Sequence, residues 1–282
     1  MRLVSYTRNG QPGFGMLRDG GVIQAQTRTE FNSLGHALRA GGLRELAALA
    51  ENEPDFSLDQ VTLEPPVVHP GKILCVGINY KAHIAETGRE PPRHPWIFVR
   101  FPDSVVGHGQ PMLRPSVSDK YDFEGELAVI IGRRAHRVER TRAMDFVAGF
   151  SCFNDGSVRN YQRHSPLFTA GKNFHRSGAF GPWLVTADEA PSPAEMKLET
   201  RLNGEVMQSA PVSDLCFDIP YLIEYCSTFA VLEPGDVIVT GTPGGVGFAR
   251  TPPLWMQPGD RIEVDISGVG CLSNPVEQEA LA

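Results

Sequence analysis

The chain has 282 residues and a formal charge of −7, and its hydrophobic and charged fractions, 41% and 21%, are ordinary for a globular protein. The negative charge argues against a nucleic-acid footprint, and no apolar run approaches the roughly 20 residues that cross a bilayer. The amino terminus reads as a strand rather than a secretory signal, and the five cysteines are dispersed. We therefore expect reduced thiols, a cytoplasmic location, and neither nucleic acid nor a membrane as partner.

The first part of the chain predicts a small N-terminal α/β domain and a proline-rich connector, together residues 1–70. Residues 1–25 alternate short apolar runs with glycine turns, which is typical of hairpin strands. Residues 33–52 change to helical spacing, and an extended stretch with four prolines follows at 53–71. We place the domain boundary at residue 70, with a catalytic domain over 71–282.

The rest of the chain is rich in short β-prone runs, several of them preceded by proline–glycine turns. One helix is predicted over 219–230, where four apolar residues would share one buried face: Leu222, Ile223, Cys226 and Phe229. An N-terminal α/β part followed by many strands favours an α+β, mainly β fold.

A histidine and a glutamate follow the first strand of this second part. If residues 80–86 form a short helix, His83 and Glu86 lie on one face of it. The carboxylate would then fix the tautomer of the ring and raise the basicity of its other nitrogen, which makes a water-activating pair. The alternative is an ordinary surface pair. Residues 87–95 predict a loop that closes over a site.

Two carboxylates stand two residues apart at the head of an apolar run. Because side chains of a strand alternate between its faces, Glu124 and Glu126 should point the same way, about 7 Å apart. A cation between them would relieve their repulsion and their lost hydration. The alternative is a polar stripe that faces solvent on an edge strand.

Asp155 ends the next apolar run. It either caps a helix that begins directly after it or completes a metal site with Glu124 and Glu126. An all-oxygen ligand set without histidine or cysteine favours Mg²⁺ or Mn²⁺, with Ca²⁺ as a third choice, over Zn²⁺.

Two later segments also contain candidate site residues. Lys172 stands among small and apolar residues, so its ammonium needs an anionic partner, and a substrate oxyanion is one candidate. The glycine-rich stretch 240–247 lacks the G-K-[ST] ending of a phosphate loop. It is interpreted either as a tight turn or as a close approach to a ligand, with Thr242 donating a hydrogen bond.

Five motifs, taken in order, resemble those of the fumarylacetoacetate hydrolase family, in particular its acylpyruvase-like and fumarylpyruvate hydrolase-like members. The likeness covers roughly residues 70–275 and rests on five groups of residues: Gly77, Asn79, Tyr80, His83 and Glu86; Asp122, Glu124, Glu126 and Leu127; Asn154, Asp155, Ser157, Arg159 and Gln162; Gly171, Lys172 and Phe174; and Thr240, Gly241, Thr242, Pro243, Gly245, Val246 and Gly247. Five motifs together are far more specific than any one of them.

The resemblance implies a fold and a set of roles. The fold would be the family's mixed β-sandwich roll behind a small N-terminal domain, usually assembled as a homodimer. The implied roles are metal ligands for Mg²⁺ or Mn²⁺ (Glu124, Glu126, Asp155), a water-activating pair on a lid (His83, Glu86), an oxyanion stabiliser (Lys172) and residues that orient the substrate (Gln162, Thr242).

The chain departs from the family pattern at two positions. Many relatives have lysine where this chain has Arg100, and aspartate where it has Asn160. Arg100 would bind a substrate carboxylate in a bidentate manner, whereas lysine acts as a point charge. Together with Arg89 and Arg93 in the lid, it suggests a substrate that carries a distal carboxylate.

The leading hypothesis is a metal-dependent hydrolase that cleaves the C3–C4 bond of a 2,4-dioxo acid, an acylpyruvate or fumarylpyruvate, to pyruvate and a carboxylic acid. One alternative is decarboxylation of a 2-oxo dicarboxylate such as oxaloacetate, which needs no activated water. Others are hydrolysis of a 2,4-dioxo-3-deoxy sugar acid, isomerisation and hydration. A catalytically silent sensor of oxo acids is the hypothesis from a different class.

Overall fold

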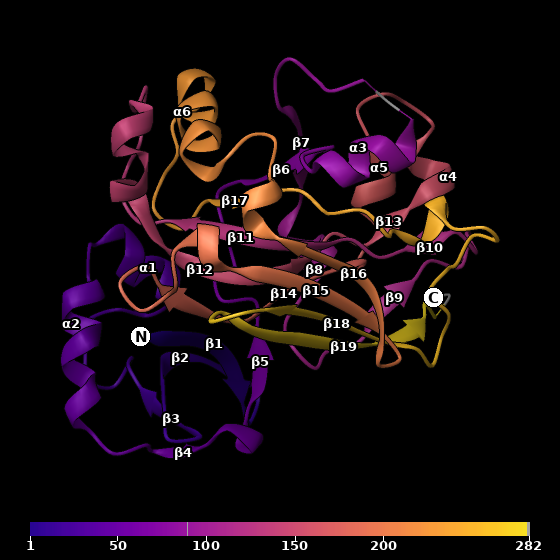
Figure 1. Cartoon of the computed structure of the whole chain (residues 1–282). Coiled ribbons are helices and arrows are strands. Elements are labelled where there is room, and N and C mark those ends of the chain that lie inside the picture. The colour runs from indigo at the N-terminus through magenta and orange to yellow at the C-terminus, as the bar shows by residue number, and fades with distance from the viewer. Residues whose placement is uncertain (89, 281–282) are drawn as a thin grey trace.

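The computed structural model describes residues 1–88 and 90–280. A 12-stranded mixed sheet packs against a five-stranded sheet, and a two-stranded ribbon completes the β structure of these residues (Figure 1). The prediction of an α+β, mainly β fold with mixed sheets is confirmed.

Ten strands form the main path of the large sheet, in the spatial order β4 (Phe56–Ser57), β3 (Gly21–Gln24), β2 (Gln11–Arg18), β1 (Arg2–Arg8), β14 (Gly178–Thr186), β12 (Val147–Asn154), β11 (Gly125–Ile131), β17 (Val237–Val239), β6 (Ile73–Gly77) and β7 (Trp96–Arg100). Two short strands pair beside this path: β5 (Thr62–Glu64) with β1, and β8 (Val105–Val106) with β14.

The five-stranded sheet has the order β16 (Glu205–Pro211), β15 (Lys197–Leu202), β18 (Arg261–Ile266), β19 (Gly270–Gln278) and β9 (Met112–Arg114). The ribbon pairs β10 (Tyr121–Asp122) with β13 (Ser157–Val158). The α-helices of the described residues are α1 (Leu34–Arg39), α2 (Leu43–Ala47), α3 (Lys81–Thr87), α4 (Arg159–Gln162), α5 (Thr169–Lys172) and α6 (Ile219–Phe229).

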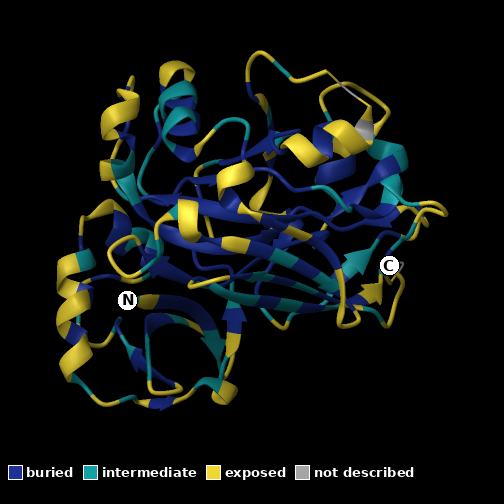
Figure 2. Cartoon of the chain, viewed as in Figure 1, coloured by how far each residue is buried: buried dark blue, intermediate teal, exposed yellow. Residues whose placement is uncertain are grey.

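Strand β11 is central because both of its faces are buried. Its odd-numbered residues, Leu127, Val129 and Ile131, belong to the core that also contains apolar residues of the five-stranded sheet. Its even-numbered residues, Ala128 and Ile130, belong to a second core on the side of α1 and α2. A strand buried on both faces reads as a continuous apolar run, which explains the sequence of β11. Figure 2 shows these inner strands as the buried centre of the molecule.

The N-terminal residues extend the large sheet rather than forming a separate one. Strand β1 pairs with β14 through Arg2 and Val185 and through Leu3 and Leu184. The predicted hairpin strands are present, and the stretch with helical spacing forms α1 and α2, between which Gly41 has a φ of +73°. The division of the chain at residue 70 stays a prediction.

Helix α6 begins and ends within one residue of the predicted range. Asp218 caps it by accepting a hydrogen bond from the Tyr221 amide at 2.9 Å. The prediction that Phe229 shares the buried face is wrong, because this residue ends the helix and is 59% exposed.

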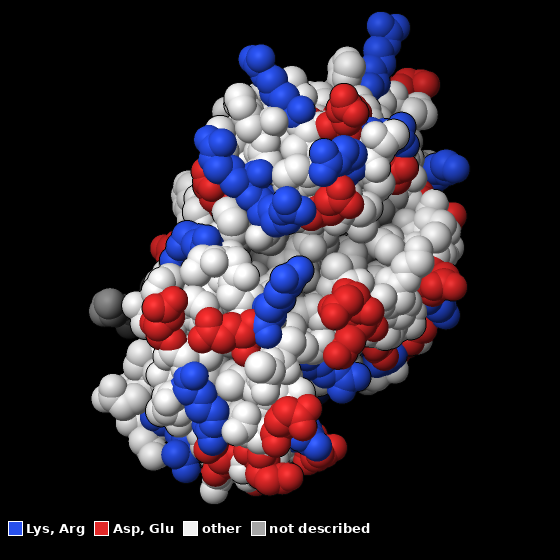
Figure 3. All heavy atoms as spheres, turned by 90° about the vertical axis from the view of Figure 1, so that its left-hand side faces the viewer, with Lys and Arg blue, Asp and Glu red and all other residues white. Residues whose placement is uncertain are grey.

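None of the helices in the described part of the chain has the length and apolar character that a bilayer crossing requires. Figure 3 shows basic and acidic side chains interspersed over one face of the molecule. The five cysteines are free thiols, three of them buried.

Candidate active site and metal centre

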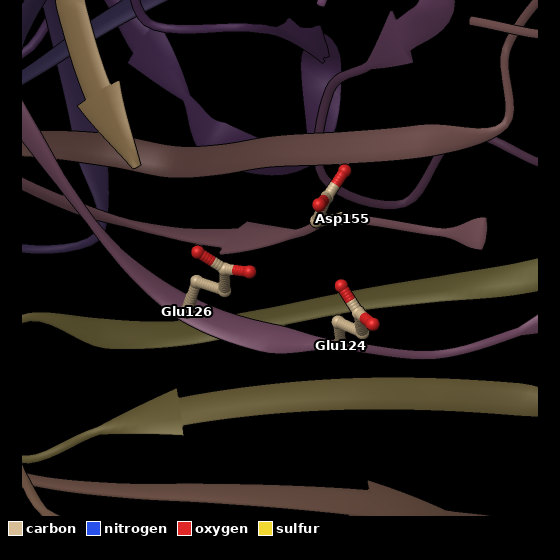
Figure 4. A group of neighbouring side chains, drawn as sticks. All are labelled: Glu124, Glu126 and Asp155. Carbon is tan, nitrogen blue, oxygen red and sulfur yellow. The ribbon is translucent and has the colours of Figure 1, made fainter. Parts of the chain in front are cut away.

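Three carboxylates meet where β11 begins and β12 ends. Glu124 directly precedes β11, Glu126 lies within it, and Asp155 directly follows β12, whose Asn154 pairs with Gly125. One oxygen from each carboxylate lies within 4.8 Å of the others, and Figure 4 shows the side chains converging from the two segments. All three residues are buried, so the alternative of a solvent-facing polar stripe is wrong.

Asp155 does not cap a helix. The chain stays extended through β13, which pairs with β10, and α4 begins only at Arg159. The Asp155 side chain instead receives a hydrogen bond of 2.6 Å from the Nη1 of Arg100. Its backbone amide donates to the carbonyl of Glu124 at 2.8 Å, which ties the two segments together.

Arg100 lies beneath the site and not in the substrate cavity. Its side chain has no exposed surface and donates to Asp155, to the carbonyls of Ser104 and Gly156, and to the hydroxyl of Ser177. The expectation that Arg100 binds a substrate carboxylate does not fit this position, because its donors are already engaged. It orients a candidate metal ligand instead.

Lys172 bridges two of the three carboxylates. Its Nζ lies 2.6 Å from an oxygen of Glu124 and 2.5 Å from one of Asp155. Burial alone would lower the pKa of Lys172, but Asp155 and Glu124 outweigh it and raise that pKa. Lys172 is therefore a charged part of the cluster, whereas the sequence predicted it beside a substrate oxyanion.

Arg159 is a further site residue whose role the sequence analysis did not assign. Its guanidinium lies 2.7 Å from Asp122 and 2.6 Å from Glu124, and it donates to the Gln162 side-chain oxygen at 2.9 Å. Burial alone would raise the pKa of Glu124, but Arg159 and Lys172 lower it to about 2. Asp122, the other partner of Arg159, also accepts from the amides of Gly247 and Phe248.

Glu126 has a different environment. Within the described chain it forms no ion pair, and its carboxylate accepts a hydrogen bond of 2.5 Å from the amide of Gly241. Gly241 has a φ of +106°, and a β-carbon there would lie 2.7 Å from that of Asn79, so only glycine fits. Burial, then Asp155 and Glu124, raise the pKa of Glu126 well above its usual value. A buried, uncompensated carboxylate beside two others is the donor set of a hard divalent cation, so Mg²⁺ or Mn²⁺ fits these residues.

The predicted histidine–glutamate pair lies on α3. The Nδ1 of His83 is 2.7 Å from one oxygen of Glu86, whose other oxygen accepts from the amide of Gly245 at 2.8 Å. His83 is only 6% exposed, so this is not an ordinary surface pair. Gly88, with a φ of +64°, caps the helix. Arg89 of the predicted lid lies outside the described residues, and Arg93 is exposed outside the cavity lining.

Several of these groups line one cavity of about 390 Å³: its wall includes His83, Glu124, Glu126, Gln162, Lys172 and Thr242. Apolar side chains, among them Phe98, Phe168 and Phe248, form much of the remaining wall. Thr242 lines the cavity, but its hydroxyl donates to the carbonyl of Gly125 at 3.0 Å and accepts from Gln208 at 2.7 Å.

Fold and site together define a class: a mixed β protein whose buried carboxylate triad can hold a divalent ion beside a histidine–glutamate pair. The sequence profile described as fumarylacetoacetate (FAA) hydrolase C-terminal matches residues 72–277. The chain therefore belongs to the fumarylacetoacetate hydrolase family, whose members include hydrolases, tautomerases and isomerases.

Two curated relatives are oxaloacetate tautomerases. YisK of Bacillus subtilis (strain 168) is 40% identical over 243 residues, which cover 83% of this chain and 81% of the relative. A human mitochondrial oxaloacetate tautomerase is 38% identical over 253 residues, 89% of this chain and 80% of that protein.

Solved structures that resemble this chain belong to the same family. The fumarylacetoacetate hydrolase of Exiguobacterium antarcticum has a TM-score of 0.85 and 33% identity, covering 99% of this chain and all of that one. Maleylpyruvate hydrolase of Sphingobium sp. SYK-6, solved with manganese(II) and pyruvate, has a TM-score of 0.82 and 30% identity, with coverage of 99% and 100%. The expected homodimer and cytoplasmic location stay predictions.

Proposed function

We propose that this protein moves a proton at carbon 3 of a 2-oxo diacid and so interconverts its keto and enol forms, with oxaloacetate as the first candidate. The observation that carries the proposal is His83, which is paired with Glu86 and lies in the wall of the cavity that Glu124 and Glu126 of the carboxylate triad also line. A carboxylate at Nδ1 raises the basicity of Nε2, which gives a base for an acidic C–H bond.

Glu124, Glu126 and Asp155 would hold Mg²⁺ or Mn²⁺, and such an ion, when bound, supplies Lewis-acid stabilisation to an adjacent oxyanion. His83 accepts the proton from carbon 3, and Glu86 stabilises the imidazolium that results. The C3–H bond breaks, a C2–C3 double bond forms, and the proton held by His83 is delivered to the oxygen on carbon 2, so His83 is regenerated, no water is consumed and no fragment leaves.

The positions of two other polar side chains favour tautomerisation over hydrolysis. Attack of water on a 2,4-dioxo acid would generate an alkoxide that needs donors, and Lys172 and Thr242 were the candidates. Lys172 is paired with Glu124 and Asp155, and the Thr242 hydroxyl donates to Gly125. Tautomerisation needs the base but forms no tetrahedral alkoxide. The two oxaloacetate tautomerases described above, which are similar to this chain, support the same choice.

Hydrolysis of the C3–C4 bond of an acylpyruvate or fumarylpyruvate is the second candidate. Its support is the volume of the cavity, which exceeds what a four-carbon acid fills, and the likeness to maleylpyruvate hydrolase. Decarboxylation of oxaloacetate remains a third outcome that the same assay detects.

The test follows the enol absorbance of oxaloacetate with purified protein and Mg²⁺ or Mn²⁺, and in parallel the release of pyruvate and carbon dioxide. We expect accelerated tautomerisation without either product. His83→Gln should lower the rate by about 10²–10⁴-fold. His136→Gln is the matched control, because His136 is exposed outside the cavity lining and should leave the rate unchanged. Full activity of His83→Gln would remove the proposed base, and stoichiometric pyruvate would decide for a rival reaction.

A further inference from the structure

A closed ring of hydrogen bonds surrounds the backbone of Gly125, the residue between the candidate ligands Glu124 and Glu126. The amide of Gly125 donates to the side-chain oxygen of Gln208 at 3.0 Å. The side-chain nitrogen of Gln208 donates to the hydroxyl of Thr242 at 2.7 Å, and this hydroxyl donates back to the carbonyl of Gly125 at 3.0 Å. The ring therefore joins three segments that lie far apart in the chain.

The ring takes the place of strand pairing at this position. Strand β17 pairs with β11 as far as Val239, and a continued register would set Thr242 opposite Gly125. The chain instead turns away at Gly241, which has a φ of +106°. The N–H and C=O groups of Gly125 would lose their partners there, and buried backbone groups need them. The side chains of Gln208 and Thr242 supply these partners.

Gln208 reaches Gly125 from the other sheet. It lies in β16 opposite Thr200 of β15, and both side chains are buried. A β-carbon at position 125 would collide with the hydroxyl of Thr200, so only glycine permits this close approach. The nitrogen of Gln208 also donates to the carbonyl of Pro243 at 2.9 Å, so both of its N–H groups are used. A buried amide whose donors and acceptor are all bonded favours a single rigid arrangement.

The ring fixes the two peptide planes that connect the ligands. The N–H of Gly125 lies in the plane shared with Glu124, and its C=O lies in the plane shared with Glu126. The orientation of these planes sets the directions in which the two carboxylates leave the backbone. Loss of a residue that orients metal ligands without touching the ion typically lowers metal affinity or activity by about 10–100-fold.

We propose that Gln208 is a positioning residue of the metal centre, and that it raises the affinity of the triad for a divalent ion by holding the backbone between two of its ligands. Gln208 lies outside the cavity lining, so it contacts neither the substrate nor the reacting atoms. The inference concerns the carboxylate triad and does not depend on which reaction the site performs.

The experiment is calorimetric titration of the metal-free, full-length protein with Mn²⁺. Gln208→Leu removes every hydrogen bond of the amide at similar side-chain volume and should raise the Kd for Mn²⁺ about 10–100-fold. Thr242→Val opens the ring at another member and should act in the same direction, whereas Thr242→Ser keeps the hydroxyl and should bind as wild type does. The double variant Gln208→Leu/Thr242→Val should bind about as weakly as the weaker single variant, because one break already opens the ring.

Gln110→Leu is the matched control. The side-chain amide of Gln110 also joins distant segments, since it donates to the carbonyl of Leu63 at 2.7 Å and to Glu64 at 2.8 Å, but it lies outside the cavity lining. Its loss should lower stability in urea without changing the Kd for Mn²⁺. Wild-type affinity in Gln208→Leu, an equal loss in Gln110→Leu, or single effects that multiply in the double variant would overturn the assignment.

The Thr242 variants decide the case in which Gln208→Leu does not fold. Weaker binding by Thr242→Val than by Thr242→Ser then supports the ring, and equal binding overturns it. Oxaloacetate tautomerisation in the same preparations separates this inference from the proposed function. Weakened Mn²⁺ binding by the ring variants, in a protein whose wild type does not tautomerise oxaloacetate, supports Gln208 and overturns that reaction. An absence of Mn²⁺ binding by wild type overturns the metal centre and the role of Gln208 together.

Discussion

Glu124 and Glu126 are two residues apart at one end of a strand, yet the two sides of the carboxylate cluster differ in charge. On the Glu124 side, Arg159 and Lys172 pair with Glu124, and Arg100 pairs with the neighbouring Asp155. On the Glu126 side, the described residues contribute a backbone amide and no ion pair. The pKa of Glu124 is accordingly lowered to about 2, while that of Glu126 is raised.

The two sides of the cluster therefore contribute to different properties. The paired side contributes to assembly of the site, and the unpaired side contributes to its affinity for a cation. The paired side holds the carboxylates in place before any ligand arrives, because each buried charge has a partner. The unpaired side keeps one carboxylate whose burial is unfavourable until a cation approaches. Carboxylates driven to opposite pKa values by their surroundings are a common way to build a functional site.

The largest expected effect comes from removing a cation on the paired side. Arg100→Met removes one buried charge partner of Asp155 and should lower the free energy of unfolding by about 3–5 kcal/mol. The measurement is urea denaturation with EDTA present. Arg100→Lys keeps the charge and should lose less. Arg134→Met is the control, since its pair with Glu233 is exposed and should contribute little. Equal stability of Arg100→Met and Arg134→Met would contradict the structural role of Arg100.

The next effect is a difference in sign between the changes in stability that substitution of the two glutamates causes. Glu124→Gln removes one charge partner each from Arg159, which keeps Asp122, and from Lys172, which keeps Asp155, and should cost about 2 kcal/mol. Glu126→Gln keeps an acceptor for the Gly241 amide and removes a carboxyl group whose ionisation is disfavoured by burial, so the metal-free protein should be as stable as wild type or more stable at neutral pH. Both variants should bind Mn²⁺ weakly. Equal destabilisation by both substitutions would break the comparison between the two sides.

The pH dependence of stability gives the smallest effect. Above the usual pKa of 4.5, the unfolded chain releases the Glu126 proton while the folded chain retains it. Stability of the metal-free protein therefore falls with rising pH, by about 1.4 kcal/mol per pH unit at most, until the folded-state pKa is passed. Glu124, with its lowered pKa, acts oppositely and loses its contribution as the pH falls from 4.5 toward about 2. The stability gap between Glu126→Gln and wild type should thus widen as the pH rises above 4.5; parallel pH profiles of the two proteins would argue against a raised pKa.

Local pattern was enough to predict the shared orientation of Glu124 and Glu126 and the histidine–glutamate pair, whereas it left Asp155 open between a helix cap and a metal ligand. Alternation along a strand places Glu124 and Glu126 on one side, and a short helix places His83 and Glu86 three residues apart on one face. Both patterns involve neighbours in the chain, and short-range geometry determines them.

The partners of these residues depend on contacts between distant segments. Arg100 is 55 residues from Asp155, and Arg159 is 37 residues from Asp122. The helix expected after Asp155 is replaced by β13, because Ser157 and Val158 pair with a strand that precedes β11. Pairing of this kind overrides local propensity. Only the unusual arginine among β-prone residues at position 100 signalled a buried role, and the sequence analysis took it for a substrate contact.

The most direct test of the central claim, that Glu124, Glu126 and Asp155 hold one divalent ion, is calorimetric titration of the metal-free protein with Mn²⁺ near neutral pH in buffers of different ionisation enthalpy. The account predicts saturable binding at one ion per chain and loss of this binding in Glu126→Gln; protons are released wherever the pH lies below the raised pKa of Glu126. Failure of wild type to bind Mn²⁺ or Mg²⁺, or equally tight binding by Glu126→Gln, would contradict it.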